Sequence, residues 1–518
     1  MSIPKVVGIE QEYAISVKGA DDLSAFHASC MLVNAYAQKV GIREPGMGVL
    51  WDYAHETPFQ DIRGELFGRK TARDVTGRED NLLINAILPN GARLYTDHAH
   101  PEYSTPECLS ATEAVACDKA GELILNEAVR LAEKILPQTT IKLFKNNIDH
   151  QGQSYGCHEN YLMDANAHEA CLVLNPGRAQ KTLIPFLVTR QVFAGSGKPG
   201  AQFEISQRAG FMECLFGLDT MFHRPLINTR QEHHADPKRF RRLHLILGDA
   251  TMSDFSTFLK IGTTQIVLQM LEDDYIASDF SLRDGLSALK QISARYDCPI
   301  EMAEGRKTNA IELQRRFLDL ARIYCQSRDI PRVPDADLIL QSWSDVLDGL
   351  ETLTLSRDCD LEDDPGDLRR KLDWVLKLWL FTRYRRKKNL SWNHPQLKVL
   401  DLQYHNIDRE ESIFYSLRDQ GLTEAIASEA EVAAFVDEAP PSTRAWFRSR
   451  CMQKFAREIY LVNWEVVGFD HGDIHRMVPL LNPLKGTRER FEEIFDKAAD
   501  SRELLALIEK MGPQPGPR

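Results

Sequence analysis

The sequence predicts an α+β protein with a large domain, residues 1–429, and a small C-terminal domain, residues 430–518. Short apolar segments with the two-residue alternation of strands recur through the first half of the chain. Residues 254–388 are mostly helical in pattern, and Pro440-Pro441 precedes a separate unit of helix, strand and helix. The 518 residues are 43% hydrophobic and 27% charged, which is typical of a globular protein with a large core.

The N-terminal elements are separated from the rest by a long irregular segment. Residues 5–16 alternate and predict a strand, and residues 21–40 have the spacing of a helix. Residues 41–80 lose this periodicity and are rich in Gly, Pro and charge. A segment of this length without elements is usually a lid or a disordered insertion, so we expect an inserted mobile loop here.

The remaining elements follow from turn and capping residues. Ser110 and Glu113 form a capping box that begins a helix ending near Leu136. The helical region is interrupted near Cys298-Pro299 and at 364–366. Further strands are expected at 82–87, 92–98, 141–144, 155–163, 203–207 and 243–247; in the small domain, Ser442 is expected to cap a helix over 443–459, followed by a strand over 461–467, a last helix and a loose tail, 512–518.

Composition excludes several function classes. The net charge of −12 argues against non-specific binding to nucleic acid. The N-terminus carries Glu10 and Glu12 early and lacks the apolar stretch of a signal peptide, and the chain has no apolar run long enough to cross a bilayer. The 10 cysteines are scattered without a CxxC pair. We therefore expect a cytoplasmic protein that binds neither nucleic acid nor membrane.

The first predicted strand places two carboxylates on one face. Side chains two residues apart in a strand point the same way, so Glu10 and Glu12 lie together. Carboxylates this close repel unless one is protonated or a cation lies between them, and carboxylate oxygens are suitable ligands for Mg²⁺ or Mn²⁺. From this motif alone, a solvated sheet face is the competing interpretation.

A second strand favours the metal interpretation. Arg93, Tyr95 and Asp97 share one face of the strand at 92–98, and Glu102 adds a carboxylate just past its end. This combination predicts a platform for a metal and a nucleotide, with Arg93 available to a phosphate. Asp97 is the natural proton acceptor or nucleophile, and the sequence leaves these two roles open.

Later strands contribute more polar residues to the same predicted sheet. A single histidine is more often a structural residue than a ligand, but together these residues have phosphate-binding and metal-binding chemistry. They are His158, Asn160, Ser206, Arg208, Arg230, His234 and His244.

Several strings of the sequence resemble those of the Pup ligase/Pup deamidase family, which has the glutamine-synthetase-like carboxylate–amine ligase fold. The similarity follows the same order along nearly the whole chain. The strings are GIEQEY (8–13), NGARLYTDHAHPEYSTPEC (90–108), KNNIDHQGQSYGCHENYL (145–162), PFLVTRQ (185–191), INTRQEHHADPKRFRRLH (227–244) and PPSTRAWFR (440–448).

The resemblance implies a curved, mainly antiparallel sheet packed on helices, with a small C-terminal domain. It implies that ATP, or ADP plus phosphate, is bound with Mg²⁺ as a cofactor, and that Pup and pupylated proteins are partners, with the proteasomal ATPase an indirect one. It assigns Asp97 as catalytic, Glu10, Tyr95 and Glu102 as Mg²⁺ ligands with Glu12 close by, and Arg93, Thr105 and Trp464 as nucleotide contacts; Arg208, Arg230 and His244 follow as phosphate or second-metal contacts.

Two features favour the deamidase branch of this family. The 41–80 insertion falls where deamidases carry a long loop, and residues 51–64 resemble the core of that loop. Asp97-His-Ala-His-Pro-Glu also has the deamidase spacing, since ligases usually have one more residue there. Cys157 and His233 depart from the usual pattern without removing a catalytic group. The activity implied is hydrolysis of the isopeptide bond between Pup and a substrate lysine, with deamidation of a C-terminal Gln of Pup.

Three alternatives remain in view. A Pup–protein ligase would use the same site but lacks the long loop. A small-molecule glutamate–amine ligase shares the paired glutamates but not the strings around Arg93 and Glu102, and a silent Pup-binding protein would not need Asp97.

The basic stretch 368–388 is either a surface that attracts acidic Pup or a solvated helix face. The sequence is compatible with a native Pup that ends in Gln, which would need deamidation, and with one that ends in Glu.

Overall fold

The computed structural model describes residues 2–20, 23–42, 85–220, 223–326, 333–353, 360–361, 363–472 and 474–511, and the backbone of 57–61. Most of the predicted insertion at 41–80 therefore lies outside the described residues. Within it, β3 (Thr57–Asp61) pairs antiparallel with β13 (Arg230–Gln231). Among the described helices, none combines the length and the hydropathy that crossing a membrane requires.

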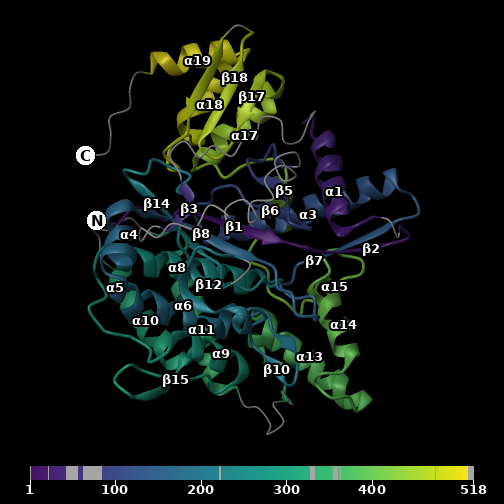
Figure 1. Ribbon diagram of the computed structural model, residues 1–518, viewed down its shortest axis with the longest axis vertical. Coiled ribbons are helices and arrows are strands. Elements are labelled where there is room, and N and C mark those ends of the chain that lie inside the picture. The colour runs from purple at the N-terminus through teal and green to yellow at the C-terminus, as the bar shows by residue number, and fades with distance from the viewer. Residues whose placement is uncertain are drawn as a thin grey trace.

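A central sheet of eight strands runs through the middle of the molecule (Figure 1). All neighbouring strands are antiparallel except β11 and β12, which confirms the prediction of a mainly antiparallel sheet. The order is β11 (Cys214–Gly217), β12 (Pro225–Asn228), β14 (Phe240–Leu245), β8 (Cys157–Asp164), β1 (Val7–Glu12), β6 (His100–Ser104), β5 (Arg93–Asp97) and β4 (Asn85–Ile87).

Three strand predictions in the larger part of the chain need correction. Residues 5–16 form two strands, because the chain leaves β1 at the buried Tyr13 and continues as β2 (Ala14–Lys18), which pairs with β7 (Thr140–Phe144). The strand expected at 203–207 is only β10 (Phe203–Glu204), paired with β9 (Lys198–Pro199). Glu102 does not lie just past a strand, because it belongs to β6.

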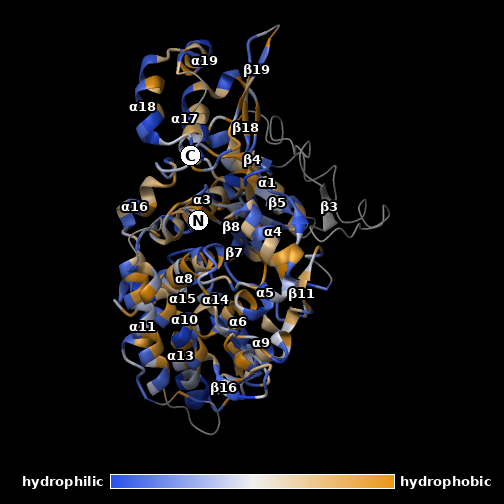
Figure 2. Ribbon diagram, turned by 90° about the vertical axis from the view of Figure 1, so that its left-hand side faces the viewer, coloured by the Kyte–Doolittle hydropathy of each residue, from blue (hydrophilic) through white to orange (hydrophobic). Residues whose placement is uncertain are grey.

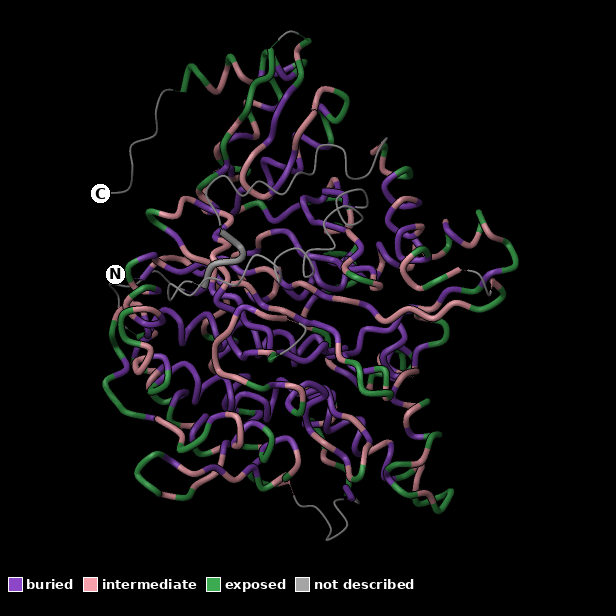
Figure 3. Tube along the Cα trace, viewed as in Figure 1, coloured by how far each residue is buried: buried purple, intermediate pink, exposed green. Residues whose placement is uncertain are grey.

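One face of the sheet is covered by helices. The core between them includes Ile9 of β1, Tyr161 of β8 and the almost wholly buried helix α8 (Asp254–Glu272). Ser110 caps α3 (Ala111–Ile135) as predicted, since its hydroxyl accepts from the Glu113 N–H at 3.0 Å and the Glu113 carboxylate accepts from the Ser110 N–H at 3.2 Å. Figure 3 shows the buried chain concentrated in the sheet and these helices.

The helical region at 254–388 is confirmed, with a break at the hairpin of β15 (Pro299–Glu301) and β16 (Lys307–Asn309). The helices of the larger part are α1 (Ala25–Lys39), α3 (Ala111–Ile135), α4 (Ala165–Glu169), α5 (Pro176–Lys181), α6 (Leu183–Thr189), α7 (Gln191–Ala194), α8 (Asp254–Glu272), α9 (Gly285–Ala294), α10 (Ala310–Cys325), α11 (Ala336–Thr352), α12 (Asp367–Lys371), α13 (Asp373–Lys388), α14 (Pro395–Tyr404), α15 (Ile413–Asp419) and α16 (Glu429–Ala434).

The basic stretch 368–388 belongs to α12 and α13, which are separated at Leu372. Arg385 and Arg386 are not free on its surface, because both pair with the buried carboxylate of Asp360, at 2.5 and 2.7 Å. Lys387 and Lys388 are exposed. Any attraction of an acidic partner by α13 therefore depends on its other exposed cations, Arg383, Lys387 and Lys388.

The C-terminal elements form a separate unit on the opposite side of the sheet from α8 (Figures 1 and 2). Thr443, not Ser442, caps its first helix, because the Thr443 hydroxyl accepts from the Ala445 N–H. The single strand expected at 461–467 is two strands with Trp464 in the turn between them. The unit comprises α17 (Arg444–Phe455), β17 (Ile459–Val462), β18 (Val466–Asp470), β19 (His475–Pro479), α18 (Arg488–Lys497) and α19 (Ser501–Lys510).

Candidate active site

The sheet register brings the predicted site residues together. Glu12 of β1 lies opposite Glu102 of β6, and Glu102 lies opposite Tyr95 of β5. Glu10 lies opposite His158 of β8. Because the apolar side chains of β1 point to the helix side, these polar groups gather on the face turned toward the C-terminal unit.

Glu12, Asp97 and Glu102 form the carboxylate cluster, in which one oxygen of each lies within 4.8 Å of the others. Burial, and then the negative charges of Asp97, Glu12 and Glu10, raise the pKa of Glu102 well above its ordinary value. Burial would also raise the pKa of Glu12, but hydrogen bonds from His100 and the Gly156 N–H hold it at about 2. The cluster concentrates negative charge that a divalent cation would neutralise.

Glu10, His158 and His244 form the histidine cluster beside it, again with ligand atoms within 4.8 Å. Burial would raise the pKa of Glu10, but a hydrogen bond from His158 and the charge of Arg242 outweigh it and hold that pKa well below its ordinary value. Burial and the charge of Arg242 lower the pKa of His244, so its ring is neutral. Among the described residues, neither ring nitrogen of His244 has a hydrogen-bond partner. A neutral buried imidazole beside a carboxylate fits a cation.

Asp97 ends β5 at the open side of the carboxylate cluster, with 31% of its side chain exposed. The hairpin to β6 turns through His98, whose φ of +52° is unusual for a residue with a side chain. His98 Nδ1 lies 2.9 Å from Asp97 Oδ1, and this hydrogen bond raises the pKa of His98. Asp97 is therefore oriented by its neighbour and remains accessible to a substrate.

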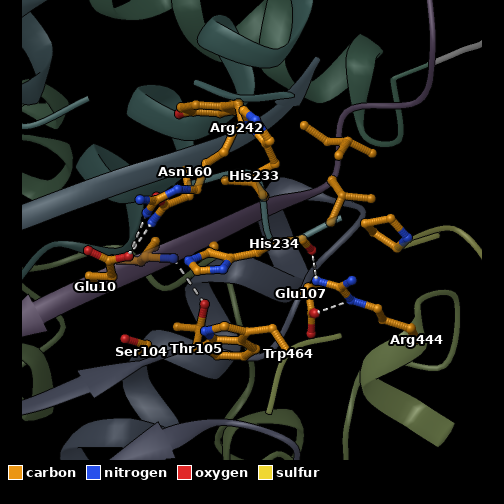
Figure 4. Close-up of a pocket in the computed structure, with 17 residues that line it drawn as sticks. Glu10, Ser104, Thr105, Glu107, Asn160, His233, His234, Arg242, Arg444 and Trp464 are labelled. Carbon is orange, nitrogen blue, oxygen red and sulfur yellow. Dashed lines mark hydrogen bonds and ion pairs between the residues drawn. The ribbon is translucent and has the colours of Figure 1, made fainter. Parts of the chain in front are cut away.

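A pocket opens between the sheet and the C-terminal unit (Figure 4); its lining includes Glu10 of the histidine cluster and none of the three members of the carboxylate cluster. Trp464 and Thr105 lie on one side of it, Arg242 and Asn160 on the other, and His234 between them. Its full lining is Val6, Val7, Gly8, Ile9, Glu10, Ser104, Thr105, Glu107, Asn160, Tyr161, Leu162, His233, His234, Arg242, Arg444, Trp464 and Pro483. Apolar walls with arginines at the rim suit a flat base attached to an anionic group.

Other predicted residues lie around these groups with contacts of their own. Arg93 is buried, donates to Asn85 Oδ1 at 2.8 Å and stacks over the ring of Tyr95. The buried guanidinium of Arg208 donates to the carbonyl oxygens of Tyr155 and Ile246. Arg208 lies outside any strand, so the strand-face argument for it was wrong.

Arg230 lies at the edge where β13 pairs with β3 of the insertion. Its Nε donates to the Leu218 carbonyl at 2.9 Å. Arg242, Glu107 and Arg444 also line the pocket, and none of the three was predicted as a site residue. Arg242 could have been found, because it precedes His244 by two residues in one strand.

Comparison with known proteins gives one family. The model of the family described as Pup-ligase protein matches residues 5–468. A depupylase of Acidothermus cellulolyticus is 43% identical, and a Pup deamidase/depupylase of Mycolicibacterium smegmatis is 36% identical; both alignments cover 97% of this chain and 99% of the relative. A Pup–protein ligase of Acidimicrobium ferrooxidans is 37% identical over 79% of this chain and 89% of its own.

Solved structures that resemble this chain belong to the same family. The ligase PafA in its complex with prokaryotic ubiquitin-like protein Pup has a TM-score of 0.76 at 25% identity, over 99% of each chain. PafA in complex with ADP has a TM-score of 0.69 at 29% identity, over 86% of this chain and 92% of that one. These matches confirm both the fold and the predicted resemblance, and the chain belongs to the Pup-ligase protein family.

Proposed function

We propose that this chain is a depupylase that hydrolyses the isopeptide bond between the C-terminal residue of Pup and a substrate lysine, and that deamidates Pup where it ends in Gln. The carboxylate cluster with the accessible Asp97 carries the proposal, in a chain 43% identical to a depupylase over nearly its full length. The depupylases also match more of the chain than the ligases do, which favours hydrolysis over ligation.

A nucleotide, ATP or ADP plus phosphate, is the proposed cofactor of the pocket in Figure 4. The ADP complex of PafA supports this assignment. Trp464 and the apolar wall would contact the base, and Thr105 would contact the nucleotide beside it. Arg93, with Arg208 and Arg230 as further candidates, would meet phosphate groups at the sheet.

Glu10, Glu12, Tyr95 and Glu102 are proposed to hold Mg²⁺, with His244 a contact for a second ion. The close carboxylates, the raised pKa of Glu102 and the ring nitrogens of His244 support a cation here. When bound, Mg²⁺ supplies a Lewis acid that polarises a carbonyl or phosphoryl oxygen.

Asp97 is proposed to act on the scissile amide at the open end of the site. A carboxylate there can accept the proton of a water whose oxygen adds to the amide carbon, or can itself add to that carbon. In both routes the C–N bond breaks and the lysine nitrogen takes up a proton. With water as the nucleophile, Pup leaves directly with a free carboxylate; with Asp97 as the nucleophile, Pup is first joined to Asp97 as an anhydride, and a water then hydrolyses this bond to release the Pup carboxylate and restore Asp97. His98 keeps Asp97 in place through its hydrogen bond.

The proposed partners are Pup and pupylated proteins, with the proteasomal ATPase met indirectly, and the proposed location is the cytoplasm. The Pup complex of PafA supports Pup binding. We also propose that residues 1–429 and 430–518 are the two domains. The hydrophobic core that α17–α19 and β17–β19 share supports this division, although the proposed boundary falls inside α16, whose Val432 packs in the core of the larger part.

The test incubates the purified chain with a pupylated protein, ATP and Mg²⁺, and separately with Pup, the unmodified protein, ATP and Mg²⁺. We expect free Pup and free protein to appear in the first mixture and no conjugate in the second. A chain that forms conjugates and releases none is a ligase, and this result would refute the proposal.

A further inference from the structure

Glu107, in the segment that follows β6, joins the sheet to the C-terminal unit. Its Oε1 accepts from Arg444 Nε at 2.7 Å and from Arg448 Nη1 at 3.2 Å, and its Oε2 accepts from Arg448 Nη2. Its backbone carbonyl accepts from the hydroxyl of Thr443, the residue that caps α17, at 2.7 Å. One residue of the sheet side therefore holds the start of α17.

Both arginines that bind Glu107 also contact residues at the wall of the pocket. Arg444 donates to the carbonyl oxygens of Leu480 and His234, both at 2.7 Å, and lines the pocket itself (Figure 4). Arg448 lies 4.8 Å from the centre of the Trp464 ring and donates to the Trp464 carbonyl at 3.3 Å. Arg448 also donates to the Gly91 carbonyl at 2.9 Å.

The Glu107 side chain is ionised at neutral pH. Burial would raise the pKa of Glu107, but the charges of Arg448 and Arg444 outweigh it and bring it to about 2. Both guanidinium groups are themselves buried, so removing the carboxylate leaves two charges without this partner in a medium of low polarity. The hydrogen bonds between Glu107 and the two arginines therefore fix the positions of both guanidinium groups, and the carboxylate balances their charge.

We propose that Glu107 is a positioning residue for nucleotide binding, which sets Arg444 and the Arg448–Trp464 stack at the wall that the C-terminal unit contributes to the pocket. This inference rests on the proposed function, in which the nucleotide occupies that pocket. Glu107 acts through the two arginines and is not required at the amide, so its loss should weaken nucleotide binding more than it slows hydrolysis.

The experiment compares full-length wild-type protein with Glu107→Gln. We measure the Kd for ADP by calorimetry, and the KM for ATP and kcat for release of Pup. We expect Glu107→Gln to raise the Kd and the KM by at least tenfold, while kcat at saturating ATP stays within about threefold. Asp360→Asn is the matched control, because Asp360 is a buried carboxylate that also holds two arginines of one helix, α13, which Figure 1 shows on the other side of the central sheet from the C-terminal unit. It should leave the Kd unchanged.

Equal ADP affinity in wild type and Glu107→Gln would overturn the inference, and so would an equal loss in Asp360→Asn or a kcat that falls as much as the KM rises. If Glu107→Gln does not fold, Arg448→Lys takes its place, because it keeps a charge for Glu107 but loses the stack on Trp464. The same separation of KM from kcat is expected, and unchanged affinity again overturns the inference. A wild-type protein that binds no ADP would instead refute the proposed nucleotide site itself.

Discussion

Glu102 is the most buried member of the carboxylate cluster, with 2% of the residue exposed. Glu102→Gln keeps the shape of the side chain and an oxygen that can accept from the Tyr95 hydroxyl, but it removes the charge. In the metal-free protein this charge is repelled by Glu12 and Asp97. We therefore predict that Glu102→Gln stabilises the metal-free protein while it destroys the metal site.

The magnitude follows from the spacing. Two unit charges 4.8 Å apart repel by about 3.5 kcal/mol at an effective dielectric constant of about 20. Because Asp97 is partly exposed, solvent screens its repulsion of Glu102, and nearby histidines offset part of the remaining repulsion. A net gain of about 1–3 kcal/mol in the free energy of unfolding remains, which corresponds to a rise of a few degrees in the melting temperature.

The pH dependence has a definite sign. Because the folded protein raises the pKa of Glu102 above its ordinary value of 4.5, ionisation of this group costs stability. The metal-free wild type should gain stability as the pH falls from above the folded-state pKa toward 4.5, and Glu102→Gln should lack this part of the gain.

The assay is thermal unfolding between pH 5 and 8, with a chelator or with Mg²⁺ and ATP. A ligand at about a hundred times its Kd adds roughly 2.7 kcal/mol to the wild type, and Glu102→Gln should lose most of that increment. Asp373→Asn is the control, because Asp373 is buried with a pKa raised chiefly by burial, outside the site; it should respond to Mg²⁺ and ATP as the wild type does. The reasoning is refuted if metal-free Glu102→Gln melts at or below the wild-type temperature over the whole pH range.

Three further predictions concern other parts of the chain. Glu10→Ala should lose most of the increase in melting temperature that Mg²⁺ with ATP gives the wild type, and an equal increase in both proteins would count against a metal ligand. Charge reversal at Lys387 and Lys388 should weaken binding of Pup, an acidic protein in this family, more at low than at high salt; equal affinity at low ionic strength would end that hypothesis. Deleting residues 41–80 should leave the fold intact and alter the rate of depupylation, and an unchanged rate and nucleotide use would show that the insertion has no role.

The polar face of the sheet could be predicted from the sequence because alternation is a local property. Glu10 and Glu12, and likewise Tyr95 and Asp97, share a strand face whatever the strands pair with. The position of Glu102 could not be predicted in this way. It depends on a tight turn at His98, whose positive φ is unusual for histidine and gives no sequence signal.

At 203–207 a strand was predicted that forms only in part. The alternating pattern is present, but a carboxylate distant in sequence binds the backbone of this segment. Buried Asp249 accepts from the backbone N–H groups of Gln207 and Arg208 and from the hydroxyl of Ser206. These bonds satisfy the backbone without a neighbouring strand, so the chain turns away after Glu204. Partners some 40 positions away cannot be found from the periodicity of one segment.

The pocket residues were missed for the same reason. Glu107 and Arg444 meet across 337 positions of sequence, and neither belongs to a repeating pattern. Family strings contained Arg444 and Arg448, but their spacing indicated a helix, not a wall of the pocket. Trp464 was assigned through the resemblance, and it lies at that wall.

The most direct measurement of the central claim is single-turnover release of Pup from a pupylated protein by Asp97→Asn. Asn has nearly the shape of Asp, but it can neither accept the proton nor form an acyl intermediate. The variant should fold and bind ADP and Pup as the wild type does, because those contacts belong to other residues, while release slows by at least about a hundredfold. Release at nearly the wild-type rate, with binding intact, would make Asp97 a structural residue and contradict the mechanism.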